Sequence, residues 1–252
     1  MSEALRVRGL VKRFGGLLAT DHADLTVLTG QCHALIGPNG AGKTTLIHQI
    51  SGSLASDAGS VCLNGQDVTA WPMHRRVRAG LVRSYQITSV FQRLSVQDNL
   101  ALALQPKAEG LWGWWTPARA DRARFEQAAQ WAERVGLSAV LGQPVGALSH
   151  GQQRQLEVAM ALATEPSVVL LDEPMAGMGP DESQRMLAWL QSIKGQVTLL
   201  LVEHDMDAVF ALADTVSVLV AGRVMATGSP HEVRQNPEVK AAYLGDEWGE
   251  AA

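Results

Sequence analysis

The chain has 252 residues, of which 46% are hydrophobic and 18% charged, a balance that excludes an intrinsically disordered protein. Its net charge of −4 provides no overall basic field that would attract nucleic acid, and two cysteines are too few for a disulfide framework. The N-terminus lacks an apolar core of signal-peptide length and no uncharged apolar run approaches the roughly 18 residues of a membrane span, so we expect a cytosolic chain unless another protein holds it at a membrane.

Two segments near the N-terminus, 5–11 and 24–28, alternate between apolar and polar residues as half-exposed antiparallel strands do. Another strand is predicted at 60–63, where the following Asn64-Gly65 favours the tight turn of a β-hairpin. The first third of the chain is therefore expected to contain a small antiparallel sheet. A basic cluster at 74–78 is interpreted as a solvated helix face rather than a partner contact.

A glycine-rich stretch at 37–45, GPNGAGKTT, lies between a predicted buried strand at 31–36 and a predicted helix at 45–50. It fits the template Gly-x-x-x-x-Gly-Lys-[Ser/Thr], and its flanks disfavour the alternative of a simple glycine-rich turn. The turn and the helix N-terminus direct several backbone N–H groups at one point, which binds phosphate. We expect Lys43 to reach the β- and γ-phosphates of a nucleotide and the Thr44 hydroxyl to bind Mg2+. The expected phosphate loop consists of Gly37, Pro38, Asn39, Gly40, Ala41, Gly42, Lys43, Thr44 and Thr45.

The middle of the chain is predicted to be helical. Apolar residues recur at helical spacing over 125–135, with Thr116-Pro117 as the expected start of this helix and Gly136 as its end. A second helix is predicted at 152–163, before Pro166. This block therefore reads as a helical insertion.

Two continuous apolar runs, 167–171 and 196–202, predict parallel strands covered on both faces, with a crossover helix at 181–193 between them. A late hairpin is expected at 215–226, and two prolines near the C-terminus each open a short helix. These elements predict an α/β fold: a mostly parallel sheet flanked by helices, an N-terminal antiparallel β-subdomain and an inserted α-helical subdomain. We expect a single domain over 1–252, with its core at 1–97 and 164–228, its helical subdomain at 98–163 and a C-terminal helical tail at 229–252.

Acidic residues follow the first of these buried strands. Because Asp172 and Glu173 come at the carboxyl edge of the sheet, where the phosphate loop also opens, we expect Asp172 to hold Mg2+ and Glu173 to polarise an attacking water. Without the phosphate loop, a solvated acidic pair would be the better interpretation. His204 follows the next strand at the same edge, which favours a γ-phosphate contact over a structural role. Gln86 offers an amide oxygen to Mg2+ or to the water, although a glutamine alone is a weak signal.

The sequence LSHGQ at 148–152 starts the second middle helix and predicts another anion site, because a serine, a glycine and a helix N-terminus come together there. One chain has no evident use for a second phosphate site. Two chains packed head to tail do, because each then covers the nucleotide of the other.

Five motifs in order give the chain a resemblance to the ATP-binding subunit of ABC transporters: the phosphate loop, Gln86, LSHGQ, VVLLDEP at 168–174 and the histidine of VEHD. The resemblance implies a P-loop NTPase core that binds ATP and Mg2+ and hydrolyses ATP. It implies that Phe14 stacks on adenine and that the Gln86 segment senses a membrane subunit. It also implies that Glu173 is the general base and His204 steadies the γ-phosphate. The residues implied to reach the γ-phosphate of ATP bound by a partner chain are Ser149, Gly151 and Gln152.

Finer features resemble the larger ATP-binding subunit of importers for branched-chain amino acids and of their relatives for urea, amides and other amino acids. They are HGQQRQLEVA after Ser149, AGMGP at 176–180 and the C-terminal NPEVKAAYLG. The resemblance implies integral membrane permease subunits, a second identical or paralogous ATP-binding subunit and, indirectly, a solute-binding protein as partners. It places the chain at the cytoplasmic face of the inner membrane and implies no nucleic-acid partner.

Two positions depart from the wider family. His150 stands where a glycine is usual, although a bulky residue there resembles this branch, and Gly179 replaces a common aspartate, which puts communication between the two sites in doubt. Three tryptophans at 112, 114 and 115 either cover the core of the helical subdomain or form an exposed patch for a partner.

Three other functions remain open from the residues. A soluble ABC-type ATPase acting on nucleic acid or ribosomes usually has a long coiled-coil insertion or two fused halves, which this chain lacks. A small-molecule kinase would leave 149–152 and His204 without roles. A subunit of a lipid or lipopolysaccharide exporter stays possible, because the motifs encode neither the direction of transport nor the substrate.

Overall fold

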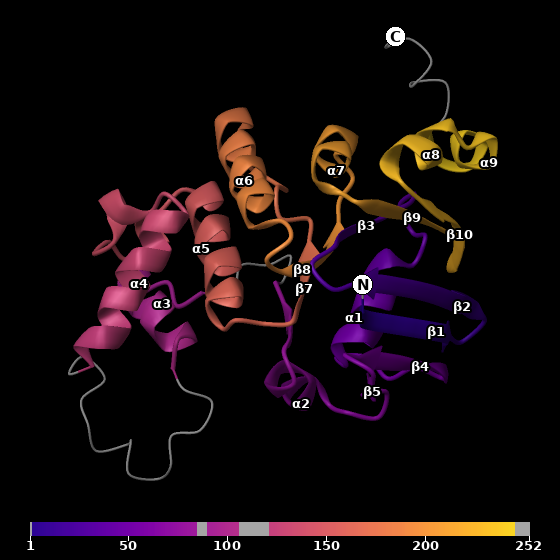
Figure 1. Ribbon diagram of the computed structural model, residues 1–252, viewed down its shortest axis with the longest axis horizontal. Coiled ribbons are helices and arrows are strands. Elements are labelled where there is room, and N and C mark those ends of the chain that lie inside the picture. Colours follow the sequence, from indigo (N-terminus) through magenta and orange to yellow (C-terminus); the bar gives the residue numbers. More distant parts are fainter. Residues whose placement is uncertain (1, 85–89, 106–120, 245–252) are drawn as a thin grey trace. The chain divides into compact units, whose positions relative to one another are not determined.

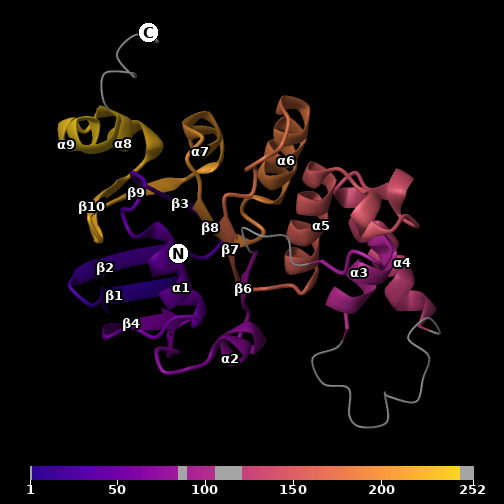
Figure 2. The same cartoon turned by 180° about the vertical axis from the view of Figure 1, so that it is seen from behind.

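The computed structural model describes residues 2–84, 90–105 and 121–244 (Figure 1 and Figure 2). Its internal contacts divide the chain into two compact units. Unit 1 consists of Met1–Arg83, Ser167–Glu173 and Ile193–Ala252, and unit 2 of Ser84–Pro166 and Pro174–Ser192. The predicted helical segment 98–163 lies inside unit 2, which is longer than this segment because it also includes 84–97, 164–166 and Pro174–Ser192.

Unit 1 contains two sheets (Figure 1). The antiparallel sheet has the order β2-β1-β4-β5, with β1 at Glu3–Phe14, β2 at Leu17–Leu28, β4 at Ala58–Leu63 and β5 at Gln66–Asp67. The second sheet has the order β10-β9-β3-β8-β7-β6, with β3 at Cys32–Ile36, β6 at Leu81–Arg83, β7 at Val168–Asp172, β8 at Thr198–Val202, β9 at Thr215–Val220 and β10 at Arg223–Gly228. All its pairings are parallel except that of β9 with β10. The predicted α/β class and both sheets are confirmed.

Local sequence explains the helices of unit 1. They are α1 at Lys43–Ser51, α2 at Met73–Arg78, α7 at Met206–Leu212, α8 at Pro230–Gln235 and α9 at Pro237–Val239, which continues into a π-helical turn, Lys240–Leu244. Helix α1 ends at Gly52 in the left-handed conformation that glycine adopts without strain. The side chain of Ser229 caps α8, whose first residue is Pro230, and Asn236 caps α9 before Pro237.

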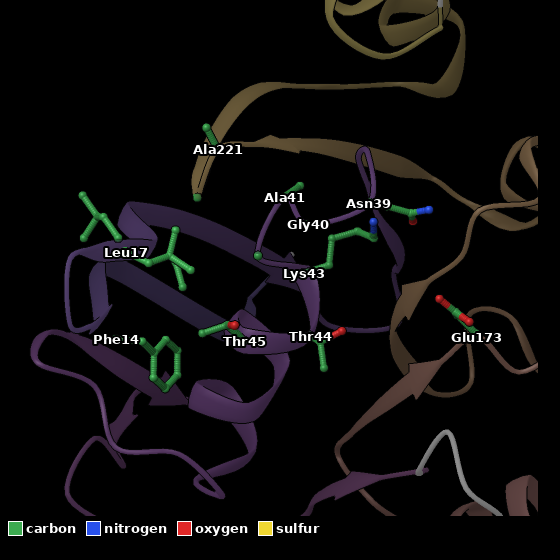
Figure 3. Close-up of a pocket in the computed structure, with 14 residues that line it drawn as sticks. Phe14, Leu17, Asn39, Gly40, Ala41, Lys43, Thr44, Thr45, Glu173 and Ala221 are labelled. Atoms are coloured by element: carbon green, nitrogen blue, oxygen red, sulfur yellow. The ribbon is translucent and has the colours of Figure 1, made fainter.

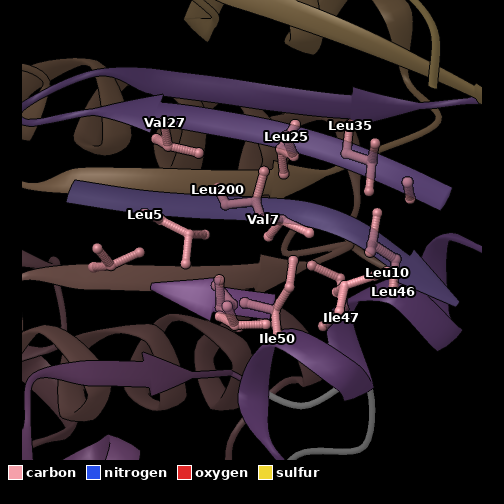
Figure 4. Packing of buried hydrophobic residues seen from close by; sticks show 14 of the residues in the cluster. Leu5, Val7, Leu10, Leu25, Val27, Leu35, Leu46, Ile47, Ile50 and Leu200 are labelled. Atoms are coloured by element: carbon pink, nitrogen blue, oxygen red, sulfur yellow. The ribbon is translucent and has the colours of Figure 1, made fainter. Parts of the chain in front are cut away.

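The strands of the parallel sheet are apolar on both sides because each side has its own core. In β3, Leu35 belongs to a cluster shared with the antiparallel sheet and α1 (Figure 4), whereas Ala34 and Ile36 pack with α7, α8 and α9. A strand covered on both faces needs no alternation of apolar and polar residues, which explains why these three residues are apolar in succession. The sheet brings the ends of β3, β7 and β8 side by side, because β8 pairs with both other strands.

The interpretation of the basic cluster as a solvated helix face is wrong at Arg76. Its side chain is buried, and its guanidinium donates to the carbonyl oxygens of Gln49, Ile50, Thr69 and Trp71 at 2.6–3.0 Å. Two of these carbonyls lie in the last turn of α1, where a helix has no partners of its own for them. Arg76 therefore caps the C-terminus of the helix that begins at the phosphate loop.

Unit 2 is built from α3 at Val96–Ala103, α4 at Arg122–Arg134, α5 at His150–Ala163 and most of α6 at Pro180–Ile193. Helix α4 is capped by Asp121 and followed by Gly136 at a φ of +73°, as predicted for its end, whereas the expected start at Thr116-Pro117 lies outside the described residues. Helix α5 begins two residues earlier than predicted, because Ser149 caps it. Among the described residues, none of the helices combines the length and apolarity needed to cross a bilayer.

Acid is expected to destabilise unit 1 through His33, which lies in β3 with 1% of its surface exposed and pairs with the Ser217 hydroxyl at 2.8 Å. Burial lowers the pKa of His33 to about 4, although a backbone hydrogen bond at Thr26 opposes the shift. In the unfolded chain the pKa of this histidine is near 6.5. The contribution of neutral His33 to the free energy of unfolding is therefore fully present above pH 6.5 and is lost as the pH falls toward 4, by about 2 kcal/mol at pH 5. Urea unfolding at pH 7 and pH 5 measures this loss.

His33→Gln keeps a donor for Ser217 but does not titrate in this range, so its stability is expected to depend less steeply on pH. The matched control is His74→Gln, at an exposed position of α2, which should behave as the parent protein does. Equal pH dependence of the two variants would contradict the assignment to His33.

Candidate functional site

The phosphate loop connects β3 to α1 and is braced by backbone on two sides. The N–H of Gly222, in the turn between β9 and β10, donates to the carbonyl of Ala41 at 2.9 Å, and the N–H of Asp21 in β2 donates to the carbonyl of Gly222 at 2.9 Å. Gly42, at a φ of +102°, approaches β2 so closely that a Cβ there would overlap the carbonyl oxygen of Ala19. The loop therefore requires glycine at this position for both its conformation and its packing.

A pocket of about 560 Å³ opens over this loop and the start of α1 (Figure 3). Its lining residues are Phe14, Leu17, Leu18, Ala19, Asn39, Gly40, Ala41, Gly42, Lys43, Thr44, Thr45, Glu173, Ala221 and Gly222. The first turn of α1 contains no acidic residue, so the positive end of its dipole faces the pocket uncompensated by a carboxylate of its own. This arrangement suits an anionic ligand with an apolar part.

Lys43 supplies the cation of the pocket. Its Nζ donates to the carbonyl oxygens of Gly37 at 2.6 Å and Pro38 at 3.0 Å, which places the ammonium within the loop. Burial lowers the pKa of Lys43, while the charges of Glu173 and Asp172 act in the opposite direction. A half-buried cation held beside the N-terminal N–H groups of a helix is suited to phosphate.

Glu173 follows β7 in a strained conformation. It is a non-glycine residue with a φ of +49°, and its N–H donates to the carbonyl of Val202 at 2.8 Å. The left-handed conformation costs roughly 1–2 kcal/mol, and such strain clusters at functional sites. The hydrogen bond to β8 holds the backbone there, and the side chain lines the pocket that contains the phosphate loop (Figure 3).

His204 lies beside Glu173. Its Nδ1 is 4.0 Å from the nearer carboxylate oxygen of Glu173 and 3.9 Å from that of Glu203, and 64% of its side chain is exposed. The next residue, Asp205, accepts from the N–H of Ala208 and caps α7. The ends of β7 and β8 thus bring the imidazole of His204 close to the carboxylate of Glu173, as the sequence predicts.

Asp172 is buried at the end of β7 and forms an ion pair with Arg83 at 2.8 Å. The sequence did not predict a role for Arg83, because its strand, β6, is only three residues long and gives no periodic signal. The donor set fits Mg2+: the Thr44 hydroxyl and the Asp172 carboxylate are oxygen ligands, and Mg2+ usually takes few protein ligands and completes its shell with phosphates and water. The described part of the chain contains no group of three or more His, Cys, Asp or Glu residues placed to hold a metal.

Phe14 stands at the mouth of the pocket, at the end of β1. The residue is 49% exposed, and the Lys12 ammonium lies 5.8 Å from the ring centroid. Leu17, across the turn, is 66% exposed and lines the same pocket (Figure 3). An exposed aromatic ring beside a phosphate site is suited to a flat heterocycle.

The LSHGQ motif lies in unit 2, whereas the phosphate loop lies in unit 1. Ser149 and Gln152 form a reciprocal cap of α5: the Ser149 hydroxyl accepts from the N–H of Gln152 at 3.2 Å, and the Gln152 side chain accepts from the N–H of Ser149 at 3.0 Å. The ring of His150 packs toward Gly177, where an added Cβ would lie 3.3 Å from it. The bulky residue at 150 is thus accommodated by a glycine.

A family model described as "ABC transporter" matches residues 20–176. The chain belongs to the ABC transporter family. A second model, described as "Branched-chain amino acid ATP-binding cassette transporter", matches residues 223–248 of this ABC transporter chain. The resemblance predicted from the five motifs is confirmed.

Two relatives resemble the ABC transporter chain over nearly its whole length. It is 38% identical to the high-affinity branched-chain amino acid transport ATP-binding protein BraF of Pseudomonas aeruginosa, covering 96% of this chain and 98% of BraF. It is 36% identical to the corresponding protein LivG of Escherichia coli, again covering 96% of this chain and 98% of the relative. The finer resemblance to this branch is therefore confirmed as well.

Solved structures agree with the fold. One is the ADP conformation of MJ1267, an ATP-binding cassette of an ABC transporter, with a TM-score of 0.85 and 30% sequence identity. The match covers 97% of this chain and 100% of the MJ1267 chain. A nucleotide-free cassette from an ABC transporter has a TM-score of 0.84 at 29% identity, covering 96% and 99%. The ABC transporter chain is thus an ATP-binding cassette with a P-loop NTPase fold, and its family is one of ATPases.

The predicted site residues of the ABC transporter chain fall into three groups. The phosphate loop, Phe14 and Glu173 are in or beside one pocket of unit 1, with His204 next to Glu173. Ser149, Gly151 and Gln152 start α5 in unit 2. Gln86 and the tryptophans at 112, 114 and 115 lie outside the described residues.

Proposed function

We propose that this ABC transporter subunit binds and hydrolyses ATP to power the import of branched-chain amino acids or related small solutes. The observation that carries the proposal is that the strained Glu173 lines the same pocket as the phosphate loop. The names of BraF and LivG support the solute class. The proposed organisation is a single ATPase domain over 1–252, with a core at 1–97 and 164–228, a helical subdomain at 98–163 and a tail at 229–252.

We assign a separate part of ATP binding to each group of residues. The N–H groups of 37–45 and the Lys43 ammonium hold the β- and γ-phosphates, and the ring of Phe14 stacks on adenine. Thr44 and Asp172 would hold Mg2+, with Gln86 as a further ligand. The metal supplies charge neutralisation for the phosphates when bound.

Hydrolysis is phosphoryl transfer to water. Glu173 accepts a proton from the attacking water, an oxygen–phosphorus bond forms at the γ-phosphate, and the bond to the bridging oxygen of ADP breaks. His204, beside Glu173, steadies the γ-phosphate. Positioning and electrostatic stabilisation supply most of the rate enhancement in this kind of reaction.

A second ATP-binding subunit, identical or paralogous, completes the site. In the proposed pair, Ser149, Gly151 and Gln152 of each chain contact the γ-phosphate held by the phosphate loop of the other. The pair works on integral membrane permease subunits at the cytoplasmic face of the inner membrane, and a solute-binding protein delivers the solute to them. Co-purification of the membrane subunits, followed by ATPase assays with branched-chain amino acids, urea and amides, tests the solute class. Stimulation by none of these solutes would reject it.

Ser149→Arg is expected to abolish ATP-dependent pairing of the subunits, because a long side chain at the start of α5 excludes the phosphate of the other chain. Pairing is measured by light scattering with ATP in a Glu173→Gln background, which prevents consumption of the nucleotide. The substitution also removes a helix cap, which costs about 1 kcal/mol, so thermal unfolding is measured in parallel. Ser138→Arg, at an exposed position of unit 2, is the matched control and should pair normally. Normal pairing of the Ser149 variant would reject the two-chain site.

A further inference from the structure

Glu182 places a carboxylate against the start of α5. It lies in the first turn of α6, and the Ser149 hydroxyl donates to one of its oxygens at 2.8 Å. The N–H of Gly179 donates to the other oxygen at 3.3 Å. All three residues belong to unit 2, so this contact is internal to one compact part of the chain.

Gly151 leaves room for this carboxylate. A Cβ at Gly151 would overlap both the Cδ and an oxygen of Glu182, so the carboxylate occupies the volume that any other residue would fill with its side chain. The first turn of α5 contains no acidic residue of its own. Glu182 therefore provides the negative charge at the positive end of this helix dipole.

The same hydroxyl cannot serve two anions at once. Ser149 has one O–H proton, and in this structure it goes to Glu182, while its oxygen accepts from the N–H of Gln152. A phosphate oxygen approaching Ser149 and Gly151 would meet a carboxylate of the same charge in the same place. Either the carboxylate moves away or the two anions repel each other.

We propose that Glu182 is an internal anion that occupies the LSHGQ surface of an unpaired subunit and has to leave before the γ-phosphate of the other chain binds there. The inference rests on the proposed two-chain site and adds a device that regulates it. Glu182 raises the ATP concentration that pairing requires, because part of the binding free energy of the phosphate is used to displace the carboxylate. The rotation of one flexible side chain is sufficient to open the surface.

Two substitutions test the proposal in the Glu173→Gln background, with light scattering as the measure of pairing at increasing ATP concentration. Glu182→Ala removes the side chain and is expected to lower the ATP concentration for half-maximal pairing at least tenfold. Glu182→Gln keeps the shape but removes the charge, and a smaller decrease of several-fold is expected. Asp181→Asn is the matched control, because Asp181 is the other acidic residue in the first turn of α6, and it should leave the value unchanged.

A second measurement separates this role from a structural one. Binding of ATP to single subunits is expected to be unchanged in both Glu182 variants, because the phosphate loop lies in unit 1. An unchanged or increased ATP requirement for pairing in Glu182→Gln, which preserves the packing, would overturn the inference while leaving the two-chain site intact. If the parent and Asp181→Asn also failed to pair at saturating ATP, the proposed two-chain site would fall and the inference with it.

Discussion

Glu173→Gln is expected to reduce ATP hydrolysis by about 10²–10⁴-fold, the contribution typical of a positioned general base, while ATP still binds. The amide keeps the size of the side chain in the pocket but cannot accept the proton of the attacking water. Phosphate release under saturating ATP measures the loss of turnover, and equilibrium binding of a fluorescent ATP analogue measures affinity. The binding constant should change by no more than about twofold, since the phosphates are held by other residues.

The chain offers a close control for this substitution. Glu165 is also a glutamate in the left-handed conformation, with a φ of +50°, but it is exposed and does not line the pocket. Glu165→Gln should leave both hydrolysis and binding unchanged. Near-normal hydrolysis by the Glu173 variant would remove Glu173 as the base.

Gly42→Ala is expected to lower the free energy of unfolding by about 3 kcal/mol and to weaken ATP binding at least 100-fold. The added Cβ collides with a backbone carbonyl of β2, which cannot rotate away as a side chain would, and the left-handed conformation adds its own cost. Either β2 or the phosphate loop has to move. Urea unfolding and titration with the fluorescent analogue measure the two effects.

Gly40→Ala separates conformation from collision. Gly40 also has a positive φ, of +78°, but a Cβ there has no atom within 4 Å. Its cost should be limited to the roughly 1–2 kcal/mol of the left-handed conformation. Equal losses in the two variants would show that the close approach to β2 has no special part in the site.

Local patterns in the sequence were sufficient for the elements that carry the ATP site. The strands β3, β7 and β8 were predicted because apolar runs need no knowledge of their neighbours, and the phosphate loop because its spacing is specific. By contrast, β6 was missed, since three residues give too little periodicity to identify an element.

The contacts that the sequence did not predict are long-range ones made by charged side chains. Arg76 was interpreted as a solvated residue, because nothing in its neighbourhood along the chain indicates the carbonyls of α1 that bury it. Arg83 and Asp172 are 89 positions apart, and Ser149 and Glu182 are 33 apart. Such pairs depend on the packing of whole elements, so a charge pattern alone gives no means of choosing the partner.

The turn at Gly222 connects the phosphate loop to segments that are distant from it in the sequence. Its hydrogen bonds join a loop from the first fifth of the chain to a hairpin near its end, and to the antiparallel sheet as well. The loop conformation is therefore fixed when the chain folds, and ATP does not have to order it, which favours tight binding. A translating ribosome has to deliver β9 and β10 before the phosphate loop gains its contact with Gly222, so a nascent chain is expected to become competent for nucleotide only after β10 has been synthesised.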